Sequence, residues 1–190
     1  AARGFPGANI NVIARKAGIS IGAMYKYFGS KEDPFLTIIE QAQGLLVDVL
    51  AEIDRSDGDI FDKLEAMVRA AQTYARRHPE LHQIYLDMTS EGLSHLSRKL
   101  SGKMETVSAR LYKRLMRAAM EQGTVDSAMD ANVAALCIDN LILMLQYSYT
   151  SDYFKERMKI FLGPDALDDD EKMVQGVMGF IRGALAGKSR

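Results

Sequence analysis

Apolar residues recur at helical spacing over most of the chain. Between positions 31 and 122 they return every three or four residues, interrupted by a polar turn at 56–59 and again just before Pro79. This period is typical of amphipathic α-helices that turn one face towards a core. The pattern predicts helices over 31–54, 60–77, 79–90 and 93–122, the last of them ended by Gly123. We find no period-2 run long enough for a strand, so the expected fold class is all-α.

The last two predicted helices have a different pattern. Residues 130–150 are apolar on nearly every side, so both faces of this helix are expected to be buried. The helix at 168–186 opens with Asp168 and Glu171, spaced as in a capping box. Glycines follow at three positions, each costing about 1 kcal/mol relative to alanine inside a helix: they are Gly176, Gly179 and Gly183. Close approach of another helix would offset that cost, so we predict a two-fold homodimer built mainly from these two segments.

Two short helices joined by a tight turn are predicted within the first thirty residues. Asn9 and Ser20 stand where N-caps are expected, and Gly18 stands where a helix ends in a left-handed residue. The second short helix covers Ile21 to Phe28. This arrangement is a helix-turn-helix, in which the second helix enters the major groove of DNA.

Charge is distributed unevenly along the chain. The 190 residues include 24 basic and 25 acidic ones, a net charge of −1. Residues 1–31 hold five basic residues and no acidic one, which leaves −6 for the remainder. A basic lobe on an acidic body indicates a polyanionic partner, although chance clustering would give the same charges.

The lobe supplies the candidate DNA contacts. The surface residues of its second helix are small, aromatic or basic, so this helix can approach phosphates closely. An alternative for Tyr27 is a partly buried core position with a wet hydroxyl. The candidate DNA-binding residues are Asn9, Asn11, Ile21, Gly22, Ala23, Tyr25, Lys26, Tyr27 and Lys31.

Several short runs in this lobe occur in a specific register. They are Gly4-Phe5, Asn9-Ile10, Ile13-Ala14, Ala17-Gly18-Ile19-Ser20, Gly22, Tyr25, Tyr27-Phe28 and Ser30-Lys31-Glu32. Together they resemble the DNA-binding domain of the TetR family of bacterial transcriptional regulators. The resemblance implies a helix-turn-helix DNA-binding domain in residues 1–40 and a larger helical effector-binding and dimerisation domain in residues 41–190. It also implies a complete first helix before Gly4; because the chain starts without methionine, we expect its first residues to be missing.

A ligand pocket is predicted between the middle helices. Unbranched methionines repack at low cost, and tyrosine adds a hydrogen-bonding tip to a flat apolar surface. Asp139 interrupts an apolar run and could face a cationic ligand, a partner chain or solvent. The candidate ligand-binding residues are Met67, Tyr74, Tyr85, Met88, Met120, Asp139, Met144 and Tyr147. An ordinary packed core remains an equally good explanation for each of them singly.

Other kinds of site find little support in the sequence. His78, His82 and His95 lack the spacing and cysteine partners of a metal site, so we expect no metal and no cofactor. The single cysteine, Cys137, indicates a reducing compartment, here the cytoplasm. The apolar run from Val133 to Leu145 is too short to span a membrane, so no membrane partner is expected.

These patterns predict a ligand-responsive DNA-binding regulator and not an enzyme. We expect a repressor that a small apolar or aromatic effector releases from double-stranded operator DNA. The alternative is an all-helical small-molecule binding protein or enzyme without a role on DNA.

Overall fold

The computed structural model describes residues 9–30, 32–88 and 94–186, and every regular element within them is a helix. The all-α prediction is therefore confirmed. The helices are α1 (Ile10–Lys16), α2 (Ile21–Tyr27), α3 (Glu32–Arg55), α4 (Ile60–Arg77), α5 (Pro79–Met88), α6 (Ser94–Glu121), α7 (Ala131–Thr150), α8 (Asp152–Leu162) and α9 (Asp170–Leu185).

Most helix ends follow from local sequence signals. Asp59 caps α4 in a capping box with Asp62, and α4 ends immediately before Pro79, as predicted. Gly123 follows α6 with φ +75°, a conformation that glycine adopts without strain. The sequence analysis missed α8, because its exposed apolar residues do not form a single inward stripe.

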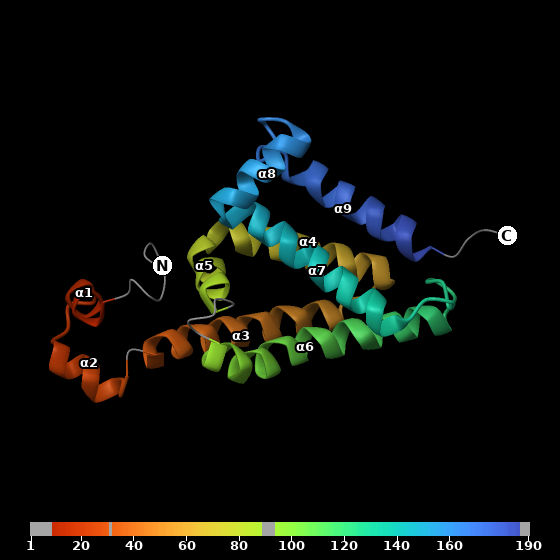
Figure 1. Cartoon of the computed structure of the whole chain (residues 1–190). Helices are drawn as coiled ribbons and strands as arrows, with labels where there is room; N and C mark the ends of the chain where they lie inside the picture. Colours follow the sequence, from red (N-terminus) through yellow and green to blue (C-terminus); the bar gives the residue numbers. More distant parts are fainter. Residues whose placement is uncertain (1–8, 31, 89–93, 187–190) are drawn as a thin grey trace.

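The helices form a two-helix lobe and a larger body (Figure 1). Helices α1 and α2 stand at one end, and the long α3 leads from them into the body. There α3 packs along α6, where Arg114 and Asp54 form an ion pair of 2.5 Å. Helices α4 and α7 cross the middle of the body, α5 stands near the lobe, and α8 and α9 cover the far side of α4 and α7.

One large hydrophobic core holds the body together. Its most deeply buried side chains come from α4, α6 and α9, and each contributes roughly 1.5–3 kcal/mol by leaving water. These are Leu64, Val68, Met116, Val174, Met178 and Ile181. Both α3 and α7 are long and apolar enough to cross a membrane by length and composition alone. Each nevertheless supplies residues to this core, as helices packed in a bundle do.

Helices α7 and α9 run antiparallel and are connected at both ends. Near the end of α7, the Gln72 amide donates to the Tyr149 hydroxyl at 2.6 Å and to the Asp170 carbonyl of α9 at 3.2 Å. Before the start of α7, the Asp126 amide donates to the Leu185 carbonyl at 3.0 Å. Because Gln72 belongs to α4, which packs against both helices, the two helices predicted to dimerise are linked through α4 at one end and by the Asp126–Leu185 bond at the other.

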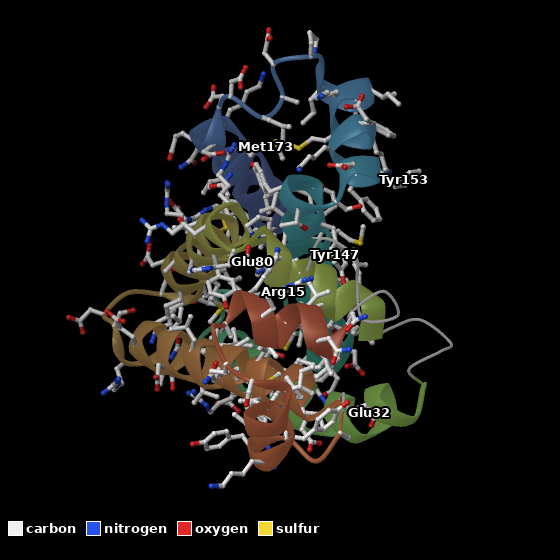
Figure 2. All side chains as sticks on the ribbon, turned by 90° about the vertical axis from the view of Figure 1, so that its left-hand side faces the viewer. Arg15, Glu32, Glu80, Tyr147, Tyr153 and Met173 are labelled. Carbon is white, nitrogen blue, oxygen red and sulfur yellow. The ribbon has the colours of Figure 1, made fainter. Side chains whose placement is uncertain are left out.

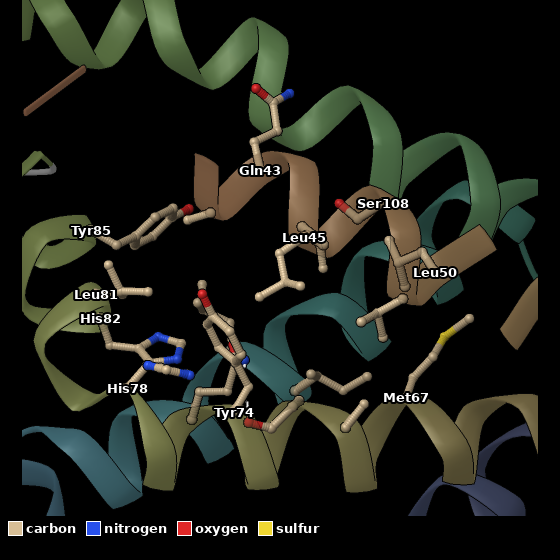
Figure 3. Close-up of a pocket in the computed structure, with 18 of the residues that line it drawn as sticks. Gln43, Leu45, Leu50, Met67, Tyr74, His78, Leu81, His82, Tyr85 and Ser108 are labelled. Atoms are coloured by element: carbon tan, nitrogen blue, oxygen red, sulfur yellow. Dashed lines mark hydrogen bonds between the residues drawn. The ribbon is translucent and has the colours of Figure 1, made fainter. Parts of the chain in front are cut away.

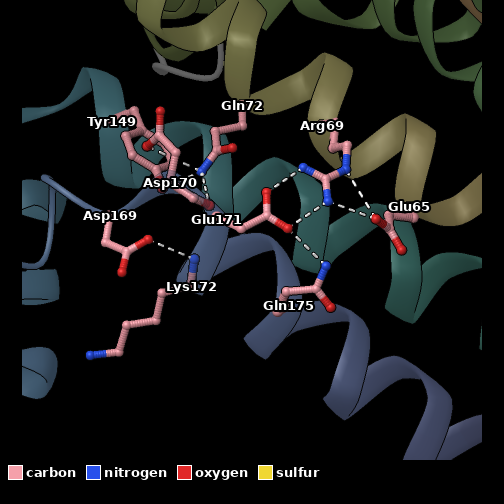
Figure 4. Close-up of polar contacts among 9 residues, drawn as sticks. All are labelled: Glu65, Arg69, Gln72, Tyr149, Asp169, Asp170, Glu171, Lys172 and Gln175. Atoms are coloured by element: carbon pink, nitrogen blue, oxygen red, sulfur yellow. Dashed lines mark hydrogen bonds and ion pairs between the residues drawn. The ribbon is translucent and has the colours of Figure 1, made fainter.

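The start of α9 differs from the prediction. Asp169, not Asp168, is the N-cap, and its carboxylate accepts from the Lys172 amide at 2.9 Å. Glu171 forms no capping box, because its carboxylate pairs with Arg69 of α4 (Figure 4). A tertiary ion pair has replaced the expected local contact.

Candidate functional site

The two-helix lobe has the geometry of a helix-turn-helix. Asn9 Oδ1 accepts from the Asn11 amide at 2.9 Å, and Ser20 Oγ accepts from the Ala23 amide at 3.0 Å. Gly18 makes the turn between the helices with φ +70°. A small core joins the two helices, made of Ile10, Ala14 and Met24 with Phe28 packed against it. The predicted caps and turn are therefore present.

The predicted DNA-contacting residues lie on the surface of this lobe. Tyr27 is 78% exposed, Tyr25 52% and Ile21 47%, so the core interpretation of Tyr27 is wrong. The remaining described candidates are Asn9, Asn11, Gly22 and Lys26, which are exposed, and Ala23, which is half-buried. Lys31 lies outside the described residues.

The exposed face carries positive charge without acidic neighbours in the sequence. No acidic residue occurs between positions 9 and 30, whereas Arg15, Lys16 and Lys26 are all exposed. Figure 2 turns the lobe towards the viewer, with Arg15 on α1. Exposed tyrosines and basic side chains on one short helix are suited to phosphate contacts on either side of a major groove.

A reciprocal cap fixes the junction between the lobe and α3. Ser30 Oγ accepts from the amides of Glu32 and Asp33 at 3.2 and 3.3 Å, and the Asp33 carboxylate accepts from the Ser30 amide at 3.1 Å. One turn further along α3, Phe35 and Ile39 pack against Ile84 of α5. The lobe therefore leads directly into a helix that is held by the body.

A cavity of about 590 Å³ lies in the body between five helices. Its lining consists largely of apolar side chains from α3 and α4, with polar groups from α5, α6 and α7. The lining residues are Ile38, Ile39, Ala42, Gln43, Leu45, Leu46, Val49, Leu50, Ile53, Met67, Arg69, Ala70, Ala71, Thr73, Tyr74, Arg77, His78, Leu81, His82, Ile84, Tyr85, Glu105, Ser108, Tyr112, Asp139, Ile142, Leu143 and Gln146. This volume is within the range of small-molecule sites.

Figure 3 shows how side chains meet in the cavity. Tyr74 rises from α4, His82 and Tyr85 reach in from α5, and Leu45 of α3 lies across from them. The Tyr85 hydroxyl donates to Glu105 Oε1 of α6 at 2.6 Å. This bond fixes one carboxylate at the wall of the cavity.

Asp139 of α7 adds a second carboxylate to the same cavity. Burial, and to a smaller extent the nearby Glu105 charge, raise its pKa to about 6. Burial also raises the pKa of Tyr112, which is 4% exposed and lines the cavity beside these acids. A carboxylate in such a place is poorly solvated and lacks compensation from a hydrogen-bonded cation.

His82 is the other unusual polar group. It is only 8% exposed, and its Nε2 has no hydrogen-bond partner among the described residues. Its ring lies edge-on to Tyr74 and Tyr147, with centroids 6.0 and 6.5 Å away. Burial lowers the pKa of His82, so the ring stays neutral near pH 7.

A second exposed surface lies on α7 and α9. Val133 and Leu136 of α7 are 58% and 59% exposed, and Phe180 of α9 is 65% exposed. One face of α7 is therefore exposed in the single chain, and its burial remains part of the dimer prediction. Among the described residues, no atom lies within 4 Å of where a Cβ would stand at Gly176, Gly179 or Gly183. The glycines of α9 thus face open space.

A family model matches the sequence of the two-helix lobe. The model described as "Bacterial regulatory proteins, tetR family" matches residues 1–37, which include α1 and α2. Residues 1–37 therefore carry the N-terminal domain of TetR-family regulators. The described part of the chain is all-helical, and the match supports a DNA-binding transcription regulator, as the sequence resemblance implied. Because the family and its structural neighbours are transcriptional regulators, they also support a non-enzymatic role.

The chain is similar to one regulator in sequence and to two solved structures in fold. The nucleoid occlusion factor SlmA of Idiomarina loihiensis is 28% identical over 146 residues, covering 72% of this chain and 73% of SlmA. The fatty acid degradation regulator FadR of Bacillus halodurans has a TM-score of 0.70 at 22% identity, over 98% and 88% of the two chains. Bacillus subtilis FadR, solved with stearoyl-CoA, has a TM-score of 0.75 at 16% identity, over 97% and 92%.

The predicted ligand-binding residues lie in the cavity, in the core or on the surface. Met67, Tyr74, Tyr85 and Asp139 line the cavity. Tyr147 is buried behind His82 and outside the lining, and Met120 packs against the main core instead. Met144 is 40% exposed on the outer face of α7, so its placement in the cavity was wrong. The side chain of Met88 lies outside the described residues.

Sequence reasoning missed the contribution of α3 to the cavity. Ile38, Leu45 and Leu46 are 38–45% exposed and lie beside the buried stripe of the same helix. Such a wide apolar face exceeds what a helix needs to pack against one neighbour, and that width was the available signal. Glu105 and His82 gave no comparable signal, because isolated polar residues on amphipathic helices usually face solvent.

Proposed function

We propose that this TetR-family regulator is a homodimeric repressor that a small, largely apolar effector releases from its operator. The observation that carries the proposal is the cavity of about 590 Å³ beside α3, the helix that also leads to the DNA-binding lobe. Residues 1–40 serve as the DNA-binding domain and residues 41–190 as the effector-binding and dimerisation domain. The site of action is the cytoplasm, where the operator lies.

DNA binding is assigned to the exposed face of the lobe. Tyr25, Lys26 and Tyr27 of α2 and the neighbouring position 31 contact phosphates, and the small residues Gly22 and Ala23 allow close approach to the groove. Asn9 and Asn11 contribute from the start of α1. Most of these contacts position the protein on the duplex, so their loss weakens binding to all sequences similarly.

Dimerisation is assigned to α7 and α9. Their open apolar faces, including Val133, Leu136 and Phe180, would form a four-helix contact with a second copy around a two-fold axis. The glycines of α9 provide close approach without a clash. A dimer of this kind holds two lobes at a fixed separation, which pairs them with two half-sites on DNA.

The effector acts through α3. Its first turns pack on α5 through Phe35, Ile39 and Ile84, and its middle forms one wall of the cavity. A ligand between α3 and α5 therefore displaces the helix on which the lobe is mounted. The two lobes then no longer match the half-sites, and DNA and effector weaken each other's binding by the same factor.

The apolar lining supports an effector with a substantial apolar body. The Bacillus subtilis FadR structure with stearoyl-CoA supports the use of this fold to bind a ligand of that kind. The alternative, a small-molecule binding protein or enzyme without DNA binding, is disfavoured by the exposed basic surface of α2 and by the family match.

The test starts from DNA. Duplexes bound by the protein are selected from a random library, and their sequence is examined for two-fold symmetry with half-sites about one helical turn or a multiple of it apart. Compounds that raise the melting temperature are then added to the selected complex. Release of symmetric operator by a compound that binds the protein supports the proposal, whereas a chain that selects no sequence contradicts it.

A further inference from the structure

The polar groups of the cavity have a consistent arrangement. Two carboxylates, Glu105 on α6 and Asp139 on α7, line a space whose walls on α3 and α4 are mainly apolar. Glu105 is fixed by the Tyr85 hydroxyl at 2.6 Å. The two acids are close enough for the charge of Glu105 to raise the pKa of Asp139.

The basic residues on the lining are directed elsewhere. Arg69 donates to Glu171 at 2.6 and 2.8 Å and to Glu65 at 2.7 Å, and its side chain is 41% exposed. His78 lies 3.5 Å from Glu80, and Arg77 is exposed at the end of α4. Among the described residues, no basic side chain therefore compensates the two carboxylates of the cavity.

We infer that the cavity binds an amphipathic organic cation. Asp139 and Glu105 hold the cationic head, and the apolar walls of α3 and α4 enclose the body. This inference rests on the proposed effector role of the same cavity and specifies the chemical class of the ligand. A bound cation offsets both the poor solvation of Asp139 and its repulsion from Glu105. Because both are unfavourable in the free protein, relieving them makes the free energy of binding more favourable.

Aromatic and histidine groups suit the same ligand. Tyr74, Tyr85 and Tyr112 line the cavity, and the faces of tyrosine rings attract organic cations. His82 stays neutral because burial lowers its pKa, so it does not repel a cation. The Nε2 atom of His82 has no hydrogen-bond partner among the described residues, although the residue is only 8% exposed. Because buried polar atoms are normally hydrogen-bonded, we expect a polar atom of the ligand to bond to this nitrogen.

The test compares three ligands that share a ten-carbon chain and differ in the charge of the head. Decyltrimethylammonium, decanoate and 1-decanol are titrated into the protein by calorimetry below their micelle concentrations. We expect the cation to bind about tenfold or more tightly than decanoate, as one charge-assisted contact in a partly buried site provides. Equal or tighter binding of decanoate by the wild-type protein would overturn the inference without any variant.

Two variants and a control locate the head group. Asp139→Asn should weaken binding of the cation about tenfold and leave decanoate binding the same or tighter. Glu105→Gln should weaken cation binding in the same direction. Asp152→Asn, the same change on the exposed start of α8, should alter neither. Unchanged cation affinity in both cavity variants, with native helix content, would contradict the assigned contact.

The inference and the proposed function fail in different ways. If the cation binds with the expected dependence on Asp139 but does not change affinity for the selected operator, the cation site is supported and the effector role is lost. If decanoate releases operator and the cation does not bind, the effector role stands and the cation site is overturned. Calorimetry and DNA binding are therefore measured separately.

Discussion

Arg69 of α4 and Glu171 of α9 form a two-pronged ion pair, although they are 102 positions apart in the chain. The two guanidinium nitrogens of Arg69 lie 2.6 and 2.8 Å from the two carboxylate oxygens of Glu171. Figure 4 shows Arg69 shared with Glu65, and Glu171 also accepting from Gln175. The bonds from Arg69 and Gln175 lower the pKa of Glu171 to about 2.

This pair predicts a pH-dependent contribution to stability. A carboxyl group with a lowered folded pKa stabilises the fold above its unfolded value of 4.5, and this stability is lost as pH falls towards 2. Glu171→Gln should therefore melt below the wild-type protein at pH 7 and equally with it near pH 2, by circular dichroism. The effect is small because both side chains are well exposed.

Glu156→Gln is the matched control for Glu171→Gln. Glu156 pairs with Lys159 at 2.7 Å within α8, so its ion pair connects no two helices. We expect a smaller shift in melting temperature for this variant than for Glu171→Gln. A larger shift in the control would show that the ion pair between α4 and α9 adds no more stability than an ion pair within one helix.

Lys26→Ala should weaken DNA binding through loss of one phosphate contact. In a plot of the logarithm of the binding constant against the logarithm of the salt concentration, the slope should change by about one unit. The change should be similar for selected and unrelated duplexes. Lys172→Ala, an exposed lysine at the start of α9, should leave both affinity and slope as in the wild type. Fluorescence anisotropy between low and moderate salt measures both. An unaltered slope in Lys26→Ala would remove this residue from the DNA surface.

Gly179→Leu should disrupt the proposed dimer. A Cβ at this position meets no atom of the described chain within 4 Å, so the monomer can accept the side chain and any loss of assembly arises between copies. Gly44→Leu on α3 is the matched control, because its Cβ also points into open space. Sedimentation should show a dimer for the wild type and Gly44→Leu and a monomer for Gly179→Leu. A monomeric wild type at micromolar concentration contradicts the interface.

Asp139→Asn should stabilise the ligand-free protein at high pH. The folded pKa of Asp139 is raised to about 6 from 3.8, so the stability linked to its protonation is complete below 3.8 and lost as pH rises through 6. Asparagine avoids this loss and should gain about 1–2 kcal/mol at pH 8, a figure reduced for partial access to water.

Denaturant unfolding of Asp139→Asn and wild type at pH 8 and pH 4 measures this difference. The groups around Asp139 include Glu105 and Tyr112 of α6 and Tyr85 of α5, and the interaction with Glu105 is one of the two causes that raise the pKa of Asp139. Glu105→Gln should therefore reduce the advantage of the asparagine variant. Equal stability of Asp139→Asn and wild type at pH 8 would mean that the carboxylate is well solvated.

Local sequence determined the lobe and most of the helix ends. Asn9, Gly18, Ser20 and Gly123 act on backbone groups within four residues of themselves, so their effect does not depend on what packs nearby. The same independence explains why the family resemblance between Gly4 and Glu32 could be recognised from short sequence motifs. The exposed face of α2 followed too, because Met24 and Phe28 define the buried side of a seven-residue helix.

Tertiary structure decided which residues line the cavity and which remain on the surface. Helix α7 is apolar on nearly every side, so its sequence does not distinguish the face that holds Asp139 from the face that holds Met144. Only packing against α4 and α6 separates them. Glu171 likewise had a local partner available, and Arg69 from a distant helix bound it instead. Contacts between helices far apart in sequence depend on how whole helices pack, and no short stretch of sequence contains that information.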